Sequence, residues 1–174
     1  MMDLDRRRVL DEVERDLDRL LFRVARLGDL PEVEKHLRLA RRRVVRASDE
    51  ARPKVAVVGA STDRSKYGNK AARAFRDAGF EVYPIHPHAE HVEGMRAFAS
   101  LDALPVRRLD RVSLYVPPSV GLRILDEVAR KDVDELWLNP GADAPEVVAR
   151  AEDLGLKVVQ ACSILAVGDH PDRL

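Results

Sequence analysis

Residues 54–79 constrain the fold of this chain more than any other stretch. Four apolar and mostly β-branched residues open it at 55–58, as in a strand that is buried on both faces. It closes with the three-and-four spacing of one helix face, carried by Ala71, Ala74, Phe75 and Ala78. A polar loop bounded by Gly59 and Gly68 lies between them. Because free N–H groups at such a helix start attract anions, the stretch predicts a site for a phosphorylated ligand, such as a nucleotide-containing cofactor.

The balance of charges argues against general nucleic-acid binding. The 174 residues carry 30 Lys and Arg against 30 Asp and Glu, so the formal net charge is zero. One cysteine cannot form an internal disulfide, which favours a reducing cytoplasm. The sequence has no run resembling a signal peptide and no apolar segment of transmembrane length. We therefore expect a cytoplasmic protein that binds neither nucleic acid nor membrane.

Residues 1–50 are charged and predict a helical hairpin, separate from a main domain at 51–174. Apolar residues follow a heptad spacing in two runs: Leu10, Val13, Leu17, Leu20, Val24 and Leu27, then Leu30, Val33, Leu37, Ala40 and Val44. Between them, Asp29 is placed to cap the second helix. The two seams can bury against each other, against the main domain or against a second copy in a homodimer, and all three remain open.

The main domain predicts an α/β fold with a Rossmann-like, doubly wound parallel sheet of about five strands. Strands alternate with helical segments, which implies right-handed crossovers. The expected strands are 55–58, 81–85, 111–116, 135–138 and 157–160. We also expect a short helical piece at 101–104, and a capping box formed by Asp143 and Glu146 at the start of a further helix.

In an open parallel sheet, ligands bind beyond the carboxyl ends of the strands. The segments that fall there contain glycine, proline or small polar residues: 59–68, 85–88, 116–119, 139–143 and 161–163. The dinucleotide fingerprint is incomplete, because the second strand ends in His86 and no acid follows before Glu90. The Gly-Lys-Ser/Thr of nucleotide hydrolases is absent as well. Both common nucleotide-binding classes are therefore disfavoured.

The loop carries side chains suited to a phosphate group. Arg64 and Lys66 can form charge-assisted hydrogen bonds, and Ser61 adds a hydroxyl donor. Ordinary solvent-exposed loop residues are the alternative for all three. Tyr67 can stack on a ligand or pack over the helix start.

A histidine cluster and the single cysteine are two further candidate chemical sites. His86, His88 and His91 have a spacing that could bind zinc, but surface histidines without metal are favoured. Cys162 could exchange disulfides with a thiol ligand or act as a nucleophile, but a small buried thiol is favoured. We therefore assign no catalytic and no metal-binding residue.

Four motifs, taken in order, resemble a known family. They are Val-Val-Gly-Ala-Ser with Lys-Tyr-Gly, then Gly-Phe-Glu-Val-Tyr-Pro-Ile-His-Pro, Tyr-Val-Pro-Pro and Leu-Trp-Leu-Asn-Pro-Gly. Residues 54–168 look like the small CoA-binding-domain proteins, which are similar to the N-terminal CoA-binding domain of the succinyl-CoA synthetase alpha subunit. The resemblance implies a Rossmann-like CoA-binding domain. The phosphohistidine-bearing domain of the synthetase is absent, so ligase chemistry is not implied.

The resemblance implies contacts from four turns. It assigns the diphosphate loop to Gly59, Ala60, Ser61, Lys66 and Gly68, and the three later turns to Pro84, His86, Pro87, Val116, Pro117, Pro118, Asn139 and Gly141. The chain departs from the family at His86, where Asn is usual, and at Ser163, where proline often follows the cysteine.

Together these observations predict a protein that binds CoA or an acyl-CoA and acts in binding or sensing without turnover. One alternative is an enzyme that depends on NAD(P) or acyl-CoA. The other is an interaction module whose N-terminal helices bind a partner.

Overall fold

The computed structural model has two compact units, Met1–Arg52 and Pro53–Leu174. It describes the backbone of residues 2–28, 30–50 and 52–174, and the side chains of residues 8–28, 30–45, 47 and 52–174. No helix in these ranges is long and apolar enough to span a lipid bilayer.

The first unit is a hairpin of α1 (Met2–Leu27) and α2 (Pro31–Glu50). Arg41 of α2 ties the two helices together, since its guanidinium pairs with Asp18 at 2.5 Å and with Glu14 at 3.3 Å, both on α1. The expected cap, Asp29, lies outside the described residues. The helical hairpin predicted from the heptad spacing is thus present.

The two helices bury only half of the predicted seam of α1. Leu10, Leu17 and Val24 are half-buried, whereas the alternating Val13, Leu20 and Leu27 are exposed. One heptad stripe therefore meets α2, and the other lies on the flank of the helix.

The second unit is built on a five-stranded parallel sheet, as the sequence predicts. Its strands are β1 (Lys54–Val58), β2 (Glu81–Ile85), β5 (Arg108–Leu114), β6 (Asp132–Leu138) and β7 (Val158–Gln160). They are ordered β2-β1-β5-β6-β7, and every neighbouring pair is parallel. The chain moves from β1 to one side for β2 and to the other side for β5. The order therefore reverses at β1, where a cleft opens in folds of this kind.

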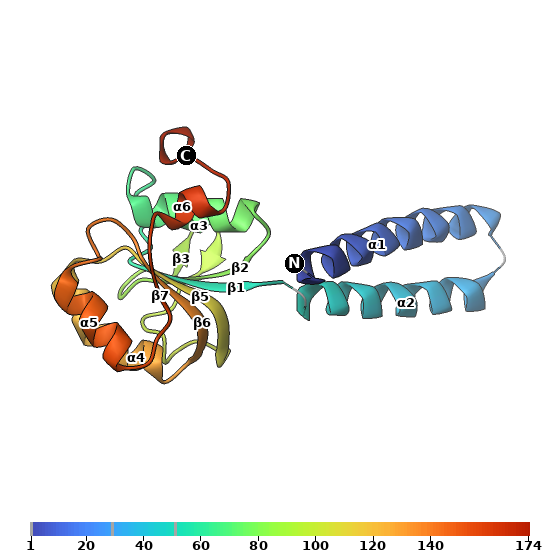
Figure 1. Ribbon diagram of the computed structural model, residues 1–174. Helices are drawn as coiled ribbons and strands as arrows, with labels where there is room; N and C mark the ends of the chain where they lie inside the picture. Colours follow the sequence, from blue (N-terminus) through green and yellow to red (C-terminus); the bar gives the residue numbers. More distant parts are fainter. Residues whose placement is uncertain (1, 29, 51) are drawn as a thin grey trace. The chain divides into compact units, whose positions relative to one another are not determined.

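Helices cover both faces of this sheet (Figure 1). α3 (Tyr67–Asp77) and α6 (Ser163–Ala166) lie on one face, and α4 (Pro118–Ala129) and α5 (Pro145–Asp153) lie on the other. Each face has its own apolar core, one centred on Phe75 and Ile164 and the other on Leu125 and Leu136. The chain ends in a 3-10 turn, η1 (Pro171–Arg173).

Three local predictions were incomplete or wrong. Residues 91–96 form a small antiparallel hairpin of β3 (His91–Val92) and β4 (Met95–Arg96), which the sequence did not indicate. Residues 101–104 form a turn and not a helix. Asp143 does not cap α5, because Ala144 is the N-cap and the Asp143 carboxylate accepts from the N–H of Gly141 at 2.9 Å. A carboxylate that folds back on its own turn is no longer available to the helix.

The crossover from β1 to α3 depends on a close contact between two backbones. A Cβ atom on Gly68 would lie 2.0 Å from the carbonyl oxygen of Gly59, and one on Gly59 would lie 2.5 Å from the carbonyl oxygen of Tyr115. Gly59 also has a φ of +84°, which disfavours any side chain. Two glycines are therefore required where the first helix packs against the strand ends.

We expect Gly68→Ala to lower the free energy of unfolding by at least about 2 kcal/mol, because the new methyl group meets backbone that cannot rotate away. Urea unfolding of the full chain measures this. Gly121→Ala in α4 is the matched control, since its Cβ would lie 3.6 Å from Val147, an ordinary contact. It should be neutral or stabilising by up to about 1 kcal/mol. Equal effects of the two substitutions would contradict the role of the Gly59–Gly68 contact.

Candidate functional site

The start of α3 faces the carboxyl ends of the central strands without a side-chain cap. Lys66 is the N-cap residue, and no side chain accepts from the first turn at that position. The N–H groups of Tyr67 and Gly68 come before any helical carbonyl that could accept from them. The first turn also contains no acidic residue. This helix end is therefore polarised toward anions and has donors to offer.

A cleft of about 1040 Å³ opens in front of this helix end. Its lining comes from all the turns at the carboxyl edge of the sheet: Gly59, Ala60, Ser61, Lys66, Tyr67, Gly68, His86, Pro87, Tyr115, Val116, Pro117, Pro118, Asn139, Pro140, Gly141, Ala142, Cys162 and Pro171. The walls combine backbone, apolar side chains and one cationic side chain, Lys66. Such a cleft suits a ligand with an anionic group and an extended, largely uncharged remainder.

Most of the residues that the sequence nominated lie in this lining, and two do not. The Arg64 guanidinium pairs with the Glu93 carboxylate and does not line the cleft. Pro84 is buried in β2, opposite Val57 of β1. The roles proposed for the lining residues in binding a ligand stay predictions.

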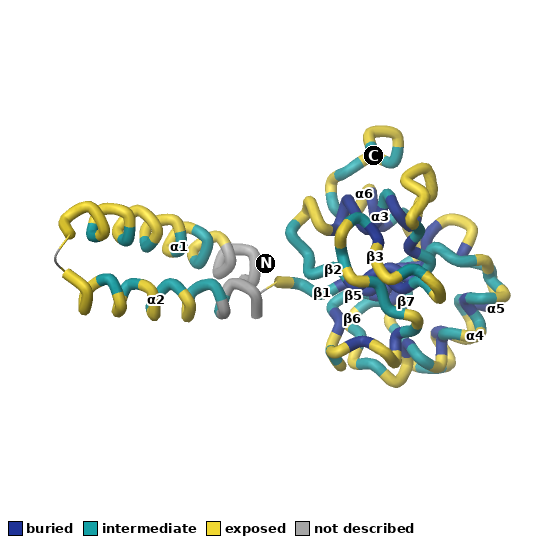
Figure 2. The backbone as a smooth tube through the Cα atoms, turned by 180° about the vertical axis from the view of Figure 1, so that it is seen from behind, coloured by how far each residue is buried: buried dark blue, intermediate teal, exposed yellow. Residues whose placement is uncertain are grey.

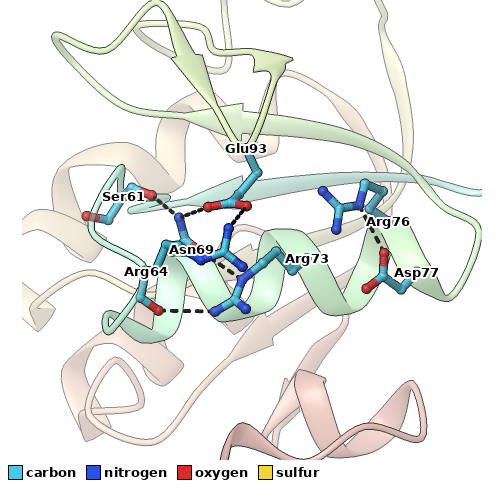
Figure 3. A network of polar contacts seen from close by, with 7 residues as sticks. All are labelled: Ser61, Arg64, Asn69, Arg73, Arg76, Asp77 and Glu93. Atoms are coloured by element: carbon cyan, nitrogen blue, oxygen red, sulfur yellow. Dashed lines mark hydrogen bonds and ion pairs between the residues drawn. The ribbon is translucent and has the colours of Figure 1, made fainter. Parts of the chain in front are cut away.

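A network of polar contacts fixes the loop that precedes α3 (Figure 3). The buried Asn69 amide donates to the carbonyl oxygen of Ser61 at 2.7 Å and to Glu93 at 3.0 Å. Arg73 donates to the Asn69 side-chain oxygen at 2.9 Å and to the carbonyl oxygen of Arg64 at 3.1 Å. Two side chains of α3 thus hold the two halves of the loop from beneath.

Glu93 joins this loop to the β3–β4 hairpin. Glu93 lies in the turn between β3 and β4 with a φ of 51°. Its carboxylate accepts hydrogen bonds from the side chains of Asn69 and Arg64. The hydrogen bond from Asn69 is the main cause that lowers the pKa of the Glu93 carboxyl, and the nearby Arg64 and Arg73 lower it further. The ionised form therefore stabilises the folded loop. This stabilisation is present at neutral pH and is lost as the pH falls through the lowered pKa.

A second buried network holds the opposite wall of the cleft. The Asn139 amide nitrogen donates to Ser113 Oγ at 2.8 Å and to the carbonyl oxygen of Leu114 at 3.0 Å, and its oxygen accepts from the N–H of Ser163 at 2.8 Å. Ser163 Oγ lies 2.8 Å from Ser113 Oγ. Because the polar atoms of Asn139 already have partners within the protein, Asn139 ties the turn after β6 to the end of β5 and to the start of α6.

Tyr115 and Cys162 line the cleft beside this network. The Tyr115 hydroxyl lies 2.8 Å from Ser163 Oγ. Burial is the main cause that raises the pKa of the Tyr115 phenol, so it stays protonated at neutral pH. Cys162 is half-buried and forms no disulfide.

His86 has its ring fixed by the following turn. Its Nδ1 accepts from the N–H of Ala89 at 2.8 Å and from the N–H of His88 at 3.1 Å. The neutral ring must therefore have its proton on Nε2. Among the described residues, no group of three His, Cys, Asp or Glu side chains is arranged to bind a metal ion.

Sequence reasoning missed several contributors. Tyr115 and Pro171 line the cleft outside the segments expected at the carboxyl edge, although Tyr115 belongs to the quoted Tyr-Val-Pro-Pro motif. Pro140 and Ala142 lie in the expected segment 139–143 but were not predicted as individual ligand contacts. Glu93, Asn69 and Arg73 support the loop from outside the cleft. Glu93 comes from a hairpin that is distant in sequence, so no local pattern indicates its contact with the loop. Asn69 and Arg73 are four residues apart on one helix face, so the hydrogen bond between them could have been predicted from the sequence.

Known proteins match the second unit. The family described as a CoA binding domain matches residues 53–169. The ADP-forming acetate–CoA ligase I of Archaeoglobus fulgidus is 29% identical over an alignment of 115 residues, and the match covers 60% of this chain but only 17% of the ligase.

Solved structures agree with this match. A conserved hypothetical protein of Pyrococcus furiosus is 31% identical with a TM-score of 0.59, covering 66% of this chain and 98% of that one. A Thermus thermophilus protein is 30% identical with a TM-score of 0.60, covering 70% and 92% of the two chains. The resemblance seen in the sequence motifs and the Rossmann-like fold are both confirmed.

Glu93→Gln tests the support of the loop. The variant keeps an acceptor for Asn69 but loses the charge that faces Arg64. We expect hydrogen exchange of the backbone amides at residues 61–66 to become roughly tenfold faster. This factor corresponds to the lower end of the free energies by which hydrogen bonds to charged groups stabilise a protein. In the wild type, the protection of these amides should fall as the pH is lowered through the pKa of Glu93. The variant should lose this part of the dependence and keep the part due to Asp63, whose carboxylate accepts from the N–H of Ser65 at 2.9 Å and has a pKa lowered mainly by Ser65.

Glu135→Gln is the matched control for this experiment. Glu135 also has a lowered pKa, mainly through a hydrogen bond from Lys157, but it does not line the cleft or contact the loop. Its substitution should leave the exchange of residues 61–66 unchanged. A Glu93→Gln variant that exchanges like the wild type at every pH would show that the loop does not depend on this carboxylate.

Proposed function

Because the chain belongs to the CoA-binding domain family, we propose that its cleft binds CoA or an acyl-CoA and that the protein acts in binding or sensing, without catalytic turnover. One observation carries this proposal: the uncapped start of α3, with Lys66 beside it, faces the cleft at the point where the strand order reverses. This is where a parallel sheet of this kind receives the phosphates of a ligand.

The donors around the helix start fit the diphosphate of CoA. Tyr67 and Gly68 offer backbone N–H groups, and Lys66 offers an ammonium group. Ser61 Oγ accepts from the N–H of Asp63 at 3.1 Å, so its own proton can be donated to the ligand. The close backbone contact between Gly59 and Gly68 leaves no side chain between these donors and a phosphate.

The remainder of the cleft fits the less polar parts of CoA. Val116, Pro117 and Pro118 form an apolar stretch of wall, and Pro87 and Pro140 extend it on either side. The His86 ring adds an N–H on Nε2 as a donor in the same lining. We propose that these residues, with Gly141, surround the nucleoside and the pantetheine arm.

An enzyme that uses NAD(P) is supported less well. An acid after the second strand normally binds the ribose hydroxyls, and here His86 stands in that place. The Tyr115 phenol is protonated and bonded to Ser163, so it is a poor base. The ligase of Archaeoglobus fulgidus extends far beyond the matched region, and its activity is not proposed for this chain.

The single cysteine and the helical hairpin bear on the cellular location of the protein and on its partners. A cytoplasmic location fits a chain whose one cysteine forms no disulfide. A role as an interaction module would depend on the helical hairpin, which is a separate compact unit from the cleft.

Lys66→Ala tests the proposed diphosphate site. We expect the variant to bind CoA roughly tenfold to a hundredfold more weakly, because a charged hydrogen bond to the diphosphate is lost. Isothermal titration calorimetry measures the affinity. Pantetheine, which lacks the diphosphate, should bind weakly to both proteins and should not distinguish them.

Lys157→Ala is the control for the removal of a positive charge. Lys157 pairs with Glu135 at 2.8 Å and lies outside the cleft lining, so its substitution should not change the affinity. An affinity for CoA that is the same in the wild type and Lys66→Ala would refute the placement of the diphosphate. A wild type with no saturable binding of CoA would refute the function itself.

A further inference from the structure

The hairpin of α1 and α2 has no core of its own. None of its described side chains is buried, in contrast to the sheet unit, where buried residues line both faces (Figure 2). Most of the large exposed apolar side chains in the described residues belong to this hairpin: Val9, Val13, Leu20, Phe22, Leu27, Leu30, Val33 and Leu39. A pair of helices this long gains little from its single shared seam, since helices in proteins depend on packing an apolar face.

Four of these side chains form one surface. Val13, Leu20 and Leu27 recur every seven residues along α1, on the flank next to the stripe that meets α2. In an antiparallel pair, the corresponding flank of α2 carries Val33, with the smaller Ala40 one heptad later. We call Val13, Leu20, Leu27 and Val33 the outer apolar face. Their exposed fractions are 40%, 43%, 70% and 43%.

In the middle turns of both helices, residues 11–26 of α1 and 32–46 of α2, the charge changes from acidic to basic along the chain. In α1 the acids come first and the arginines increase toward the end: Asp11, Glu12, Glu14, Asp16 and Asp18, with Arg15, Arg19, Arg23 and Arg26. In α2, two acids precede a basic run: Glu32 and Glu34, then Lys35, Arg38, Arg41, Arg42, Arg43 and Arg46. The outer ends of the hairpin helices carry the opposite sign, Arg6, Arg7 and Arg8 at the start of α1 and Asp49 and Glu50 at the end of α2. Two antiparallel helices of this kind therefore bring the acidic segment of one beside the basic segment of the other. Within the hairpin, the ion pairs of Arg41 with Glu14 and Asp18 are an example.

A second copy of the hairpin matches this pattern. When two such hairpins stack face to face about a two-fold axis along or across the helices, every helix meets an antiparallel neighbour from the other copy. Across residues 11–26 and 32–46, opposite charges then meet in both arrangements, and the outer apolar face of each copy covers that of the other. Asp16 and Arg23, which lie between the apolar residues of this face, would face oppositely charged halves.

We propose that the outer apolar face is a homodimer interface, at which two copies of the chain form an antiparallel four-helix bundle. This interface is outside the region matched by the CoA-binding family, which begins at residue 53. It gives the chain a means of presenting two clefts in one particle.

Sedimentation velocity of the full chain over a range of concentrations tests this proposal. The wild type should sediment as a particle of about twice the 19.5 kDa chain mass. Leu20→Asp should sediment as a monomer, because it places two charges in the interface of each dimer. Leu20→Ala, which favours helix, should raise the dimer dissociation constant at least about tenfold through the lost apolar contacts. Circular dichroism establishes that both variants keep their helix content.

Leu39→Asp is the matched control, because Leu39 is 48% exposed but lies away from the outer apolar face. It should remain a dimer. A monomeric wild type would mean that the face is covered by the second unit or by another protein, and would overturn the proposal. A dimer that survives both Leu20 substitutions would also overturn it. CoA affinity, measured on the same samples, should be unaffected by Leu20→Asp, so a failure of this proposal is distinguishable from a failure of the proposed function.

Discussion

The contact between the carbonyl group of Gly59 and the backbone of Gly68 sets the geometry of the whole cleft. No side chain can stand at either position without displacing backbone, so α3 begins directly against the end of β1. This brings the first N–H groups of the helix to the edge of the sheet where the strand order reverses. This approach places the helix start in the cleft, and Lys66 at the N-cap position leaves its first N–H groups without a side-chain acceptor.

Polar networks on either side of this contact keep the loops in place. Asn69, Arg73 and Glu93 support the loop before α3, while Asn139, Ser113 and Ser163 hold the ends of the strands opposite. Within the described part of the chain, no buried side-chain nitrogen or oxygen lacks a hydrogen-bond partner. Fully satisfied networks of this kind rigidify a site, because any rearrangement leaves a buried polar atom unpaired. The walls of the cleft are therefore formed before any ligand arrives.

The sequence predicted the sheet, its parallel sense and most of the cleft, because these depend on local patterns. Apolar β-branched runs indicated the strands, and the glycine and proline turns after them indicated the carboxyl edge. What it did not predict depends on pairing between distant residues. Arg64 was expected to face an anion, but its partner Glu93 comes from a hairpin whose two-residue strands are too short to leave a pattern. Only half of the seam predicted for α1 is covered by α2, because periodicity alone could not divide it into an inner and an outer stripe.

The Asn139 network and a lysine of α3 connect segments that are far apart in the chain. Asn139 needs the N–H of Ser163, and Lys70 donates to the carbonyl oxygen of Pro171 at 2.6 Å. The first hydrogen bond joins the turn after β6 to the start of α6, and the second joins α3 to η1. A nascent polypeptide that has left the ribosome only as far as β6 would have one wall of the cleft unsupported. That wall takes its final form only after the segment around Ser163 has been synthesised and packed.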